Sequence, residues 1–373
     1  MKHTLPLRLA LVAAVLGAVA PGLAAQSGTT QDNTAYGTTS AEFLLLGAGA
    51  RGTALGGAFG AIANDASALY YNPAGTALMT RPDVVIGTYD YVADTRYTWG
   101  GIAFPFDGAS KNIGFQLGTF GFKNQPVYTA DQPDGTGATY NVSETFLGLT
   151  YSQNFSDRFS AGVTAKYISD NLGDASGSAF AVDFGTSFHA QLSGHPVKFS
   201  FVLSNLGTNI SYSGSALNTS SPRDSVNGVG GVPNLPQPSQ LRTKDFPLPT
   251  TFRVGLAYDL LTANSARLTV LGDFNQPNNN KAGFSAGTEF QTRNLGGSPF
   301  SAAVRGSYTY FASNNISPST LPTAMNDEQN LEGLAVGGGL SYNSGNFSLS
   351  VDYAYKYMGI LGGTNFISFG LGW

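Results

Sequence analysis

The sequence predicts an all-β protein, a closed antiparallel transmembrane β-barrel of about 14 strands with a small N-terminal helical hatch in its lumen. Apolar and polar residues alternate through nearly the whole chain after residue 83, which indicates strands whose two faces meet different surroundings. Only 11% of the 373 residues are charged and 48 are Gly. A soluble β-sandwich would carry many Lys and Glu residues on its outer face, whereas the polar faces here are mostly Ser, Gly, Thr and Ala.

The first 25 residues have the three parts of a secretory signal peptide. Lys2 and Arg8 precede an apolar run from Leu9 to Ala20, and small residues up to Ala25 follow it as a cleavage site. The apolar run is too short to span a bilayer as a helix, which takes roughly 20 residues. We therefore expect residues 1–25 to be removed on export.

Residues 26–82 do not alternate, and we predict that they form the hatch. Asn64 or Asp65 is a candidate N-cap for a short helix that ends at Tyr71. Asn72 is a candidate N-cap for the next helix, with Pro73 at its first position, where a missing N–H costs nothing. A fourteen-stranded barrel has a lumen wider than its own side chains fill, so we expect these helices to plug it. The expected hatch residues are Asp65, Tyr70, Tyr71, Asn72, Pro73 and Ala74.

Residues 83–373 hold the alternating segments that we predict to be the barrel. In one of them Leu349, Val351 and Tyr353 alternate with Ser350 and Asp352. An even number of strands closes the sheet without an edge, as lipid requires, because it cannot hydrogen-bond free backbone groups. The fourteen segments lie near 83–92, 95–104, 111–122, 142–153, 158–169, 178–190, 196–206, 250–260, 266–275, 281–291, 299–311, 331–342, 346–356 and 364–373.

The connections between these segments differ in length in a regular way. Those after odd-numbered strands include long ones at 123–141, 170–177, 207–249 and 312–330, whereas those after even-numbered strands are brief. Short turns on one rim and long loops on the other are typical of barrels in the bacterial outer membrane, with the short turns periplasmic. We therefore expect the outer membrane as location and its lipid as a partner. The longest connection, 207–249, is expected to be functional or disordered.

Charged residues on the polar strand faces are predicted to point into the lumen, because Arg or Lys facing lipid at mid-bilayer would cost about 2–4 kcal/mol. Their mixed signs favour pairing with one another and with the hatch over a selective ring. These residues are Lys166, Asp183, Arg253, Asp259, Asp273, Glu289, Arg305, Asp352 and Lys356.

Catalytic, metal and nucleic-acid sites are not expected. Beyond the signal peptide only His189 and His195 remain, and His189 shares a strand face with Asp183 and Ser187. These are the residue types of a hydrolase triad, but residues along one strand lie in a line, so we interpret them as a polar stripe. The chain has no Cys, no calcium-loop spacing and no phosphate-binding loop, which argues against a metal or cofactor. A net charge of −4 offers no basic surface for nucleic acid.

The stretch GARGTALGGAFGAIANDASALYYNPAGTALM resembles the N-terminal signature of the PorV/PorQ family, a branch of the FadL/TodX-like outer-membrane proteins, and Asn72-Pro73-Ala74 is the shared element. SNLG at 204–207, LPTTFRVGLAYD at 248–259 and DYAYKYMGILGGTNFISFGLGW at the end extend the resemblance. It implies a fourteen-stranded barrel with an N-terminal hatch, in agreement with the strand count. The alternating end of the chain, Phe369, Leu371 and Trp373, resembles the assembly signal of bacterial outer-membrane barrels.

Two functions stay open at this point. A PorV-type protein would be an accessory of type IX secretion that docks secretion subunits and secreted cargo through extracellular loops, and the family resemblance favours this function. A FadL-type protein would instead let hydrophobic molecules, or detergent in their place, pass through the hatch region and across the barrel wall. An apolar pocket just outside the hatch would favour the uptake of hydrophobic molecules, and a long structured extracellular loop would favour the docking of proteins.

Overall fold

The computed structural model describes residues 37–221, 237–311 and 333–373, all within one unit, Ala35–Trp373. The expected signal peptide, the central part of the predicted connection 207–249, the whole predicted connection 312–330 and the first two residues of the predicted strand 331–342 lie outside the described residues. None of the helices in the described ranges is both long and apolar enough to cross a membrane.

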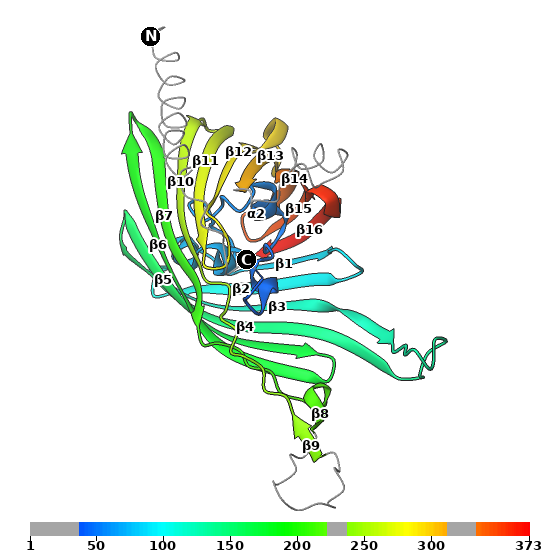
Figure 1. The fold of residues 1–373 in the computed structure, drawn as a ribbon. Coiled ribbons are helices and arrows are strands. Elements are labelled where there is room, and N and C mark those ends of the chain that lie inside the picture. The colour runs from blue at the N-terminus through cyan, green and yellow to red at the C-terminus, as the bar shows by residue number, and fades with distance from the viewer. Residues whose placement is uncertain (1–36, 222–236, 312–332) are drawn as a thin grey trace, which may run out of the picture. The chain divides into compact units, whose positions relative to one another are not determined.

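Fourteen antiparallel strands close into a barrel, as predicted (Figure 1). The barrel is closed by β1 and β16, which pair from Asp83↔Gly372 to Thr88↔Ile367. Its strands are β1 (Asp83–Asp90), β2 (Arg96–Phe106), β3 (Lys111–Pro126), β4 (Thr139–Ser156), β5 (Phe159–Leu172), β6 (Ala175–Leu192), β7 (His195–Gly207), β10 (Thr251–Thr262), β11 (Ala266–Pro277), β12 (Gly283–Thr292), β13 (Phe300–Phe311), β14 (Leu334–Asn343), β15 (Ser348–Tyr357) and β16 (Gly363–Gly372).

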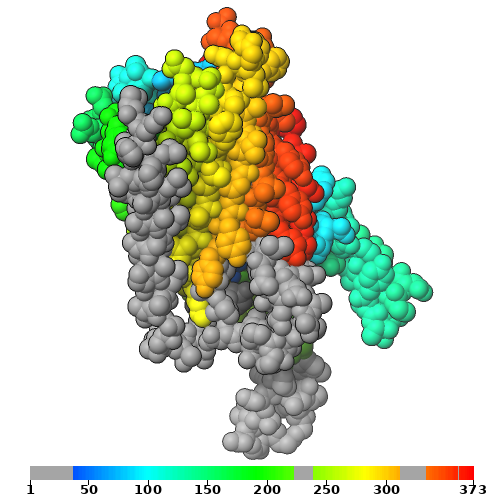
Figure 2. Space-filling model, turned by 90° about the horizontal axis from the view of Figure 1, so that it is seen from above, coloured from blue at the N-terminus to red at the C-terminus, as the bar shows by residue number. Residues whose placement is uncertain are grey.

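The alternation of the sequence becomes the two faces of this wall. In β15 the side chains of Leu349, Val351 and Tyr353 are exposed on the outside, whereas Asp352 and Ala354 point inward and are largely covered. The same holds around the ring, so large apolar residues dominate the outer face. In Figure 2 the strands between residues 250 and 373 form one continuous surface.

The connections define two rims. Short turns, the start of β1 and the end of β16 lie at one rim, which we call the short-turn rim. The opposite rim, the long-connection rim, carries the connections β3–β4, β7–β10 and β13–β14. The predicted long connection at 170–177 is wrong: β5 and β6 continue in register to Leu172↔Ala175 and turn through Gly173 with φ 66°. Its polar residues resemble a loop because a strand that extends beyond the lipid-facing wall needs no apolar outer face: Asn171 and Ser176 are exposed, whereas Asp170 on the inner face is buried and accepts a hydrogen bond from Tyr212.

The longest connection is partly structured. It contains η3 (Ser215–Leu217) and a two-stranded sheet of β8 (Asn218–Ser221) and β9 (Gln237–Gln240). Short 3-10 helices η4 (Leu295–Gly297) and η6 (Gly359–Leu361) occupy two other connections.

The N-terminal segment, residues 37–82, contains η1 (Glu42–Leu45), α2 (Ala50–Ala54), α3 (Ala68–Tyr71) and η2 (Pro73–Leu78). Asn72 caps η2 as predicted, since its Oδ1 accepts a hydrogen bond from the N–H of Ala74. The predicted cap at Asn64 or Asp65 is wrong: α3 begins only at Ala68, and Asp65 instead accepts from the N–H of Ser67 within the preceding turn. Helix α2 was not predicted, because its Gly-rich flanks are poor helix formers.

This segment lies within the ring of strands and runs from one rim to the other (Figure 1). Near its start, Thr39 accepts a hydrogen bond from Asn279 in the β11–β12 connection. Before α3, the N–H of Ala66 donates to Asp83 at the start of β1, on the short-turn rim. Helix α2 packs mainly against β13 to β16 on one side of the lumen, and η2 packs mainly against β4, β5 and β6 on the other.

Candidate functional site

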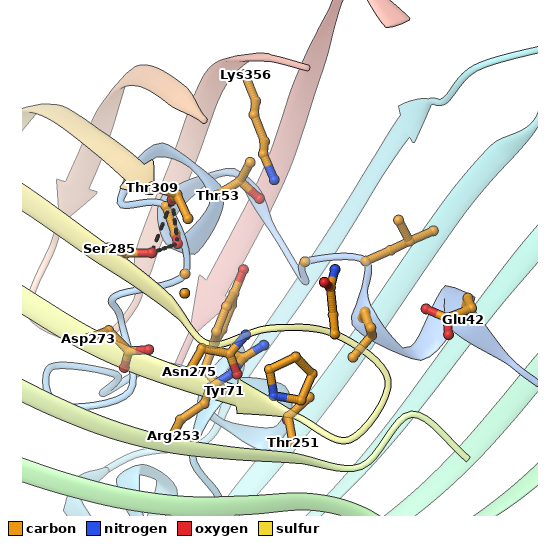
Figure 3. A pocket seen from close by; sticks show the side chains of 18 of the residues that line it. Glu42, Thr53, Tyr71, Thr251, Arg253, Asp273, Asn275, Ser285, Thr309 and Lys356 are labelled. Carbon is orange, nitrogen blue, oxygen red and sulfur yellow. Dashed lines mark hydrogen bonds between the residues drawn. The ribbon is translucent and has the colours of Figure 1, made fainter. Parts of the chain in front are cut away.

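A cavity of about 540 Å³ lies on the long-connection side of the N-terminal segment (Figure 3). Aromatic rings form one part of its wall, from Tyr70 and Tyr71 in α3, Tyr89 and Tyr91 at the end of β1, and Phe366 in β16. A volume of this size is within the range that holds drug-sized molecules, roughly 300–1,000 Å³. We call it the outer chamber.

Another part of the lining of the outer chamber is polar and adjoins the aromatic part, since Arg253, which Figure 3 labels together with Asp273, interacts with Tyr70. The Nε of Arg253 and the Oδ1 of Asn275 are buried without a hydrogen-bond partner. Lys356, predicted to face the lumen, lines the chamber from β15. An aromatic side and a polar side together suit a molecule that has an apolar body and a polar group.

Tyr70 and Tyr71 form the floor of the chamber. The hydroxyl of Tyr70 donates to the carbonyl oxygen of Leu44 at 3.0 Å, which ties η1 to α3. Burial raises the pKa of Tyr70 to about 12, so this donor stays protonated at neutral pH. The ring of Tyr71 meets those of Tyr70 and Phe59 edge to face, with centroids 4.9 and 5.2 Å away.

A second cavity, of about 310 Å³, lies toward the short-turn rim, and we call it the inner chamber. It is lined mainly by polar and charged side chains, among them Arg51, Asp65, Arg293, Arg305 and Asp352. None of the described residues that line the outer chamber also lines the inner one.

Helix α2 stands between the two chambers. Thr53 contributes to the lining of the outer chamber and Arg51, half a turn earlier, to that of the inner one. The backbone of this part of the segment is tied to the wall by single hydrogen bonds: the N–H of Ala50 donates to Ser368 Oγ, and Ser307 Oγ donates to the carbonyl oxygen of Ala54, each at 3.0 Å.

Arg51 also joins α2 to a chain of buried charges. Its Nε and one terminal nitrogen donate to the two oxygens of Glu289 in β12, at 3.0 and 3.1 Å. Glu289 is fully buried and also accepts from Arg305 at 2.7 Å, and Arg305 in turn pairs with Asp352 at 2.6 Å. On its own segment, Arg51 pairs with Asp65 at 2.9 Å. Burial alone lowers the pKa of Arg51, but the carboxylates of Glu289 and Asp65 outweigh it and raise the pKa above its ordinary value.

On the other side, the Asn72-Pro73 step fits against β5 and β6. The Asn72 side-chain amide donates to the carbonyl oxygens of Gly60 and Thr186, at 2.9 and 3.1 Å, and Asn72 is fully buried. A Cβ at Gly185 in β6 would lie 2.2 Å from Asn72 Oδ1, and a Cβ at Gly162 in β5 would lie 2.6 Å from the Pro73 carbonyl carbon. Only glycine allows this approach. Next along the chain, the carbonyl oxygen of Ala74 accepts from Ser160.

The structure keeps other predicted lumen charges apart from the Arg51 network. Lys166 and Asp183 form a buried ion pair at 2.6 Å between β5 and β6. Asp259 accepts from Thr269 at 2.6 Å. Asp183 therefore faces a lysine and not His189, whose ring nitrogen lies 3.2 Å from Ser187 Oγ.

His195 binds the backbone carbonyl of Asp259 through its Nδ1, at 2.8 Å. Across residues 37–221, 237–311 and 333–373, no three His, Cys, Asp or Glu side chains are grouped as metal ligands. The expected assembly residues Phe369, Leu371 and Trp373 lie at the end of the chain with exposed side chains, and their role in assembly stays a prediction.

Sequence reasoning missed Arg51 and Gln116. Gln116 in β3 accepts from the indole of Trp99 and donates to the carbonyl oxygen of Leu69, so it joins the wall to α3. Nothing in its surroundings marks Gln116 in the sequence. Arg51 had a signal, since it is the one basic residue between positions 37 and 80.

The β7–β10 connection reaches back over the mouth of the barrel. The hydroxyl of Tyr212 donates to Asp170 in β5 at 2.9 Å and lies 2.7 Å from the hydroxyl of Ser40. The N–H of Ser40 donates to the carbonyl oxygen of Pro247 at 3.0 Å, and Ile210 and Leu248 are buried. Both ends of this connection therefore contact the N-terminal segment.

On the outer face, an apolar groove of about 700 Å³ crosses β1 to β6. Large side chains such as Ile86, Phe115 and Phe180 border it, and its floor includes Gly100 and Gly148. The groove lies on the surface that the alternation predicts to face lipid.

The chain matches the model of an uncharacterised protein family (UPF0164) over residues 14–259. No curated protein sequence matches it. Neither of these comparisons points to the PorV/PorQ family, which stays a prediction.

Solved structures that share the fold include the following three. The CymD monoaromatic hydrocarbon channel has a TM-score of 0.53 at 13% identity and covers 88% of this chain and 97% of its own. The Ralstonia pickettii toluene transporter TbuX has a TM-score of 0.51 at 12% identity, and the match covers 88% of this chain and 98% of TbuX. A deltaS2 mutant of the TodX monoaromatic hydrocarbon channel also has a TM-score of 0.51, at 12% identity, and the match covers 87% of this chain and 98% of the mutant.

Proposed function

The chain belongs to the uncharacterised protein family UPF0164, and we propose that it is an outer-membrane channel for small molecules with an apolar body. The N-terminal segment acts as its hatch. A solute would enter from the long-connection rim, which faces outward, and bind in the outer chamber. The protein would work by binding and passage, without a chemical reaction.

The outer chamber is the observation that carries this proposal. It lies inside a closed barrel, on the long-connection side of the N-terminal segment, and five aromatic rings form part of its lining. Such rings bury apolar solutes well and hold planar ones in a fixed orientation. The polar side, with the unpartnered Nε of Arg253, would orient a solute that also has a hydrogen-bond acceptor.

The solved structures that share the fold motivate the choice of solute. CymD and TodX are described as monoaromatic hydrocarbon channels and TbuX as a toluene transporter. At 12–13% identity this likeness shows only the fold, so the chamber has to carry the functional argument. The expected role in type IX secretion finds no support in these comparisons, and we do not retain it.

Uptake of radiolabelled toluene and of benzoate tests the proposal in a host that lacks channels of this fold. The full chain should raise the uptake rate of at least one of the two. Leu46→Trp would fill the outer chamber, which Leu46 lines, and should reduce that rate several-fold. Leu349→Trp makes the same change on the exposed outer face and should leave uptake unchanged.

Uptake that is equal with and without the protein would contradict the proposal, as would equal uptake by the Leu46→Trp and parent barrels. Heat-modifiable migration of each barrel on gels serves as the assembly check.

A further inference from the structure

We propose that solutes leave the outer chamber along the barrel axis, through the inner chamber, and that the contact between Arg51 and Glu289 is the gate between the two. This inference rests on the proposed channel function and adds to it the exit route and the residues that close it. It replaces the expected passage across the barrel wall.

The position of α2 supports an axial route. The chambers share the wall formed by β12, β13 and β15: Ser285, Thr309 and Lys356 line the outer chamber, and Gln291, Arg305 and Asp352 line the inner one. Helix α2, only five residues long, is in contact with β13 to β16 and separates the chambers at this wall. Displacing this one short helix would join them.

The wall beneath the outer groove is closed, which argues against a lateral exit. Strands β1 to β5 pair without a break there, through Ile86↔Gly100, Gly101↔Gln116 and Gly148↔Lys166. The register shifts of β1 to β6 lie away from these pairs, next to Phe122 in β3, next to Asn154 in β4 and, toward β7, between Val182 and Phe184 in β6. None of the described residues that border the groove lines the outer chamber. The groove is therefore a depression of the outer surface.

The charges around Arg51 are arranged so that the contact can break without isolating a buried charge. If α2 moves, the flexible side chain of Arg51 can stay on Asp65, which lies outside α2 in the same segment. Glu289 keeps Arg305 at 2.7 Å and has Arg267 within 3.7 Å, because these belong to the wall. A buried ion pair is costly to break mainly when one partner is left uncompensated. Here neither is.

The backbone on both sides of α2 is suited to a hinge. Gly49 before the helix has φ 73°, and Gly56 and Gly57 after it have φ 63° and 80°. Glycine adopts such conformations without strain and changes between them at low cost. The Asn72-Pro73 step is held separately against β5 and β6, so α2 can move while the rest of the segment stays in place.

Ion conductance in planar bilayers tests the gate without requiring any hydrophobic solute. Arg51→Gln and Glu289→Gln should each raise the conductance of the full-length barrel several-fold, and the double variant should not exceed the larger single effect, since both changes break one contact. Lys166→Gln is the control, because it removes a buried ion pair of the wall that lies away from Arg51.

A labelling experiment provides a second readout in this cysteine-free chain. Tyr91→Cys in the outer chamber and Ser350→Cys in the inner chamber are exposed to a charged methanethiosulfonate reagent added only on the long-connection side. The first should react in any background, and the second only together with Arg51→Gln.

Unchanged conductance of an assembled Arg51→Gln barrel would overturn the proposal, as would an equal rise in the Lys166→Gln control. So would labelling of Ser350→Cys in the otherwise unaltered chain. If Glu289→Gln does not assemble, Arg51→Gln decides the question, because Arg51 is not part of the wall. A gate that behaves as expected in a barrel that takes up neither toluene nor benzoate would support the axial route and contradict the proposed function.

Discussion

The N-terminal segment is held in the barrel by two unlike kinds of contact. Around Asn72 and Pro73 it fits into a recess that exists because β5 and β6 present glycines, and its hydrogen bonds go to backbone carbonyls. Around α2 it is held by an ion pair whose two members each have another partner, together with single hydrogen bonds from Ala50 and to Ala54 and a close approach of Ala54 to Gly337. The close packing around Asn72 and Pro73 allows one arrangement, whereas charges that share several partners allow several arrangements of similar energy. One side of the segment is thus built as an anchor and the other as a moving part.

Closing the glycine recess should have the largest effect. Gly185→Val would place its side chain against Asn72 and the Pro73 ring and should destabilise the anchored side by about 3 kcal/mol, as overpacking does in a rigid core. We expect a lower midpoint of thermal unfolding, measured by heat-modifiable migration on gels. Gly272→Val is the matched control, because nothing lies within 4 Å of a Cβ at that strand position. Equal midpoints for the two variants would show that the recess is no anchor.

Removing the Asn72 amide should have the next largest effect. Asn72→Ala loses two hydrogen bonds to carbonyls and the cap of η2, which together should cost about 2 kcal/mol. The barrel should still assemble, but the segment should be digested faster by protease. Thr80→Ala changes an exposed residue of the same segment and should leave the digestion rate nearly unchanged. An Asn72→Ala barrel as resistant as the parent would remove the distinction between the two sides.

Alkaline pH should have the smallest of the three effects: it should weaken the packing around Tyr70 and leave the Arg51 contact intact. Tyr70 has an ordinary pKa of 10.0 that burial raises to about 12 in the folded protein. Its neutral form therefore stabilises the fold fully below the ordinary pKa, and this contribution is lost as the pH rises through the folded pKa. About 1 kcal/mol should be lost by about pH 11. Arginine stays charged in this range, so the Arg51 contact should persist.

The fluorescence of Trp99 measures this loosening, because Trp99 is joined through Gln116 to the carbonyl of Leu69. Trp373→Phe removes the second of the two tryptophans. In a chain that carries Trp373→Phe, the further change Tyr70→Phe should weaken the dependence of Trp99 fluorescence on pH between about 9 and 11. The same dependence with and without Tyr70 would assign the titration to another group.

Much of the fold could be predicted because its signal is local. Leu349 and Asp352 differ in their surroundings simply because they lie on opposite faces of one strand, and period two in the sequence states this directly. The cap at Asn72 is equally local, since Pro73 follows it and Ala74 supplies the donor. The tight turn between β5 and β6 was not predicted, because the polar residues on either side of Gly173 are as common in a loop as in a strand that extends beyond the wall.

The sequence by itself determined the barrel, its inward charges and the helical character of the segment after Asn72, because each depends on neighbours a few positions away. Only the tertiary structure decided which charges meet. Arg51 and Glu289 are 238 positions apart, and no pattern of either one's neighbours predicts their contact. It arises because closing the ring of strands around the segment brings β12 opposite α2. The two chambers have the same origin, since they are the volume left where that segment does not fill the lumen.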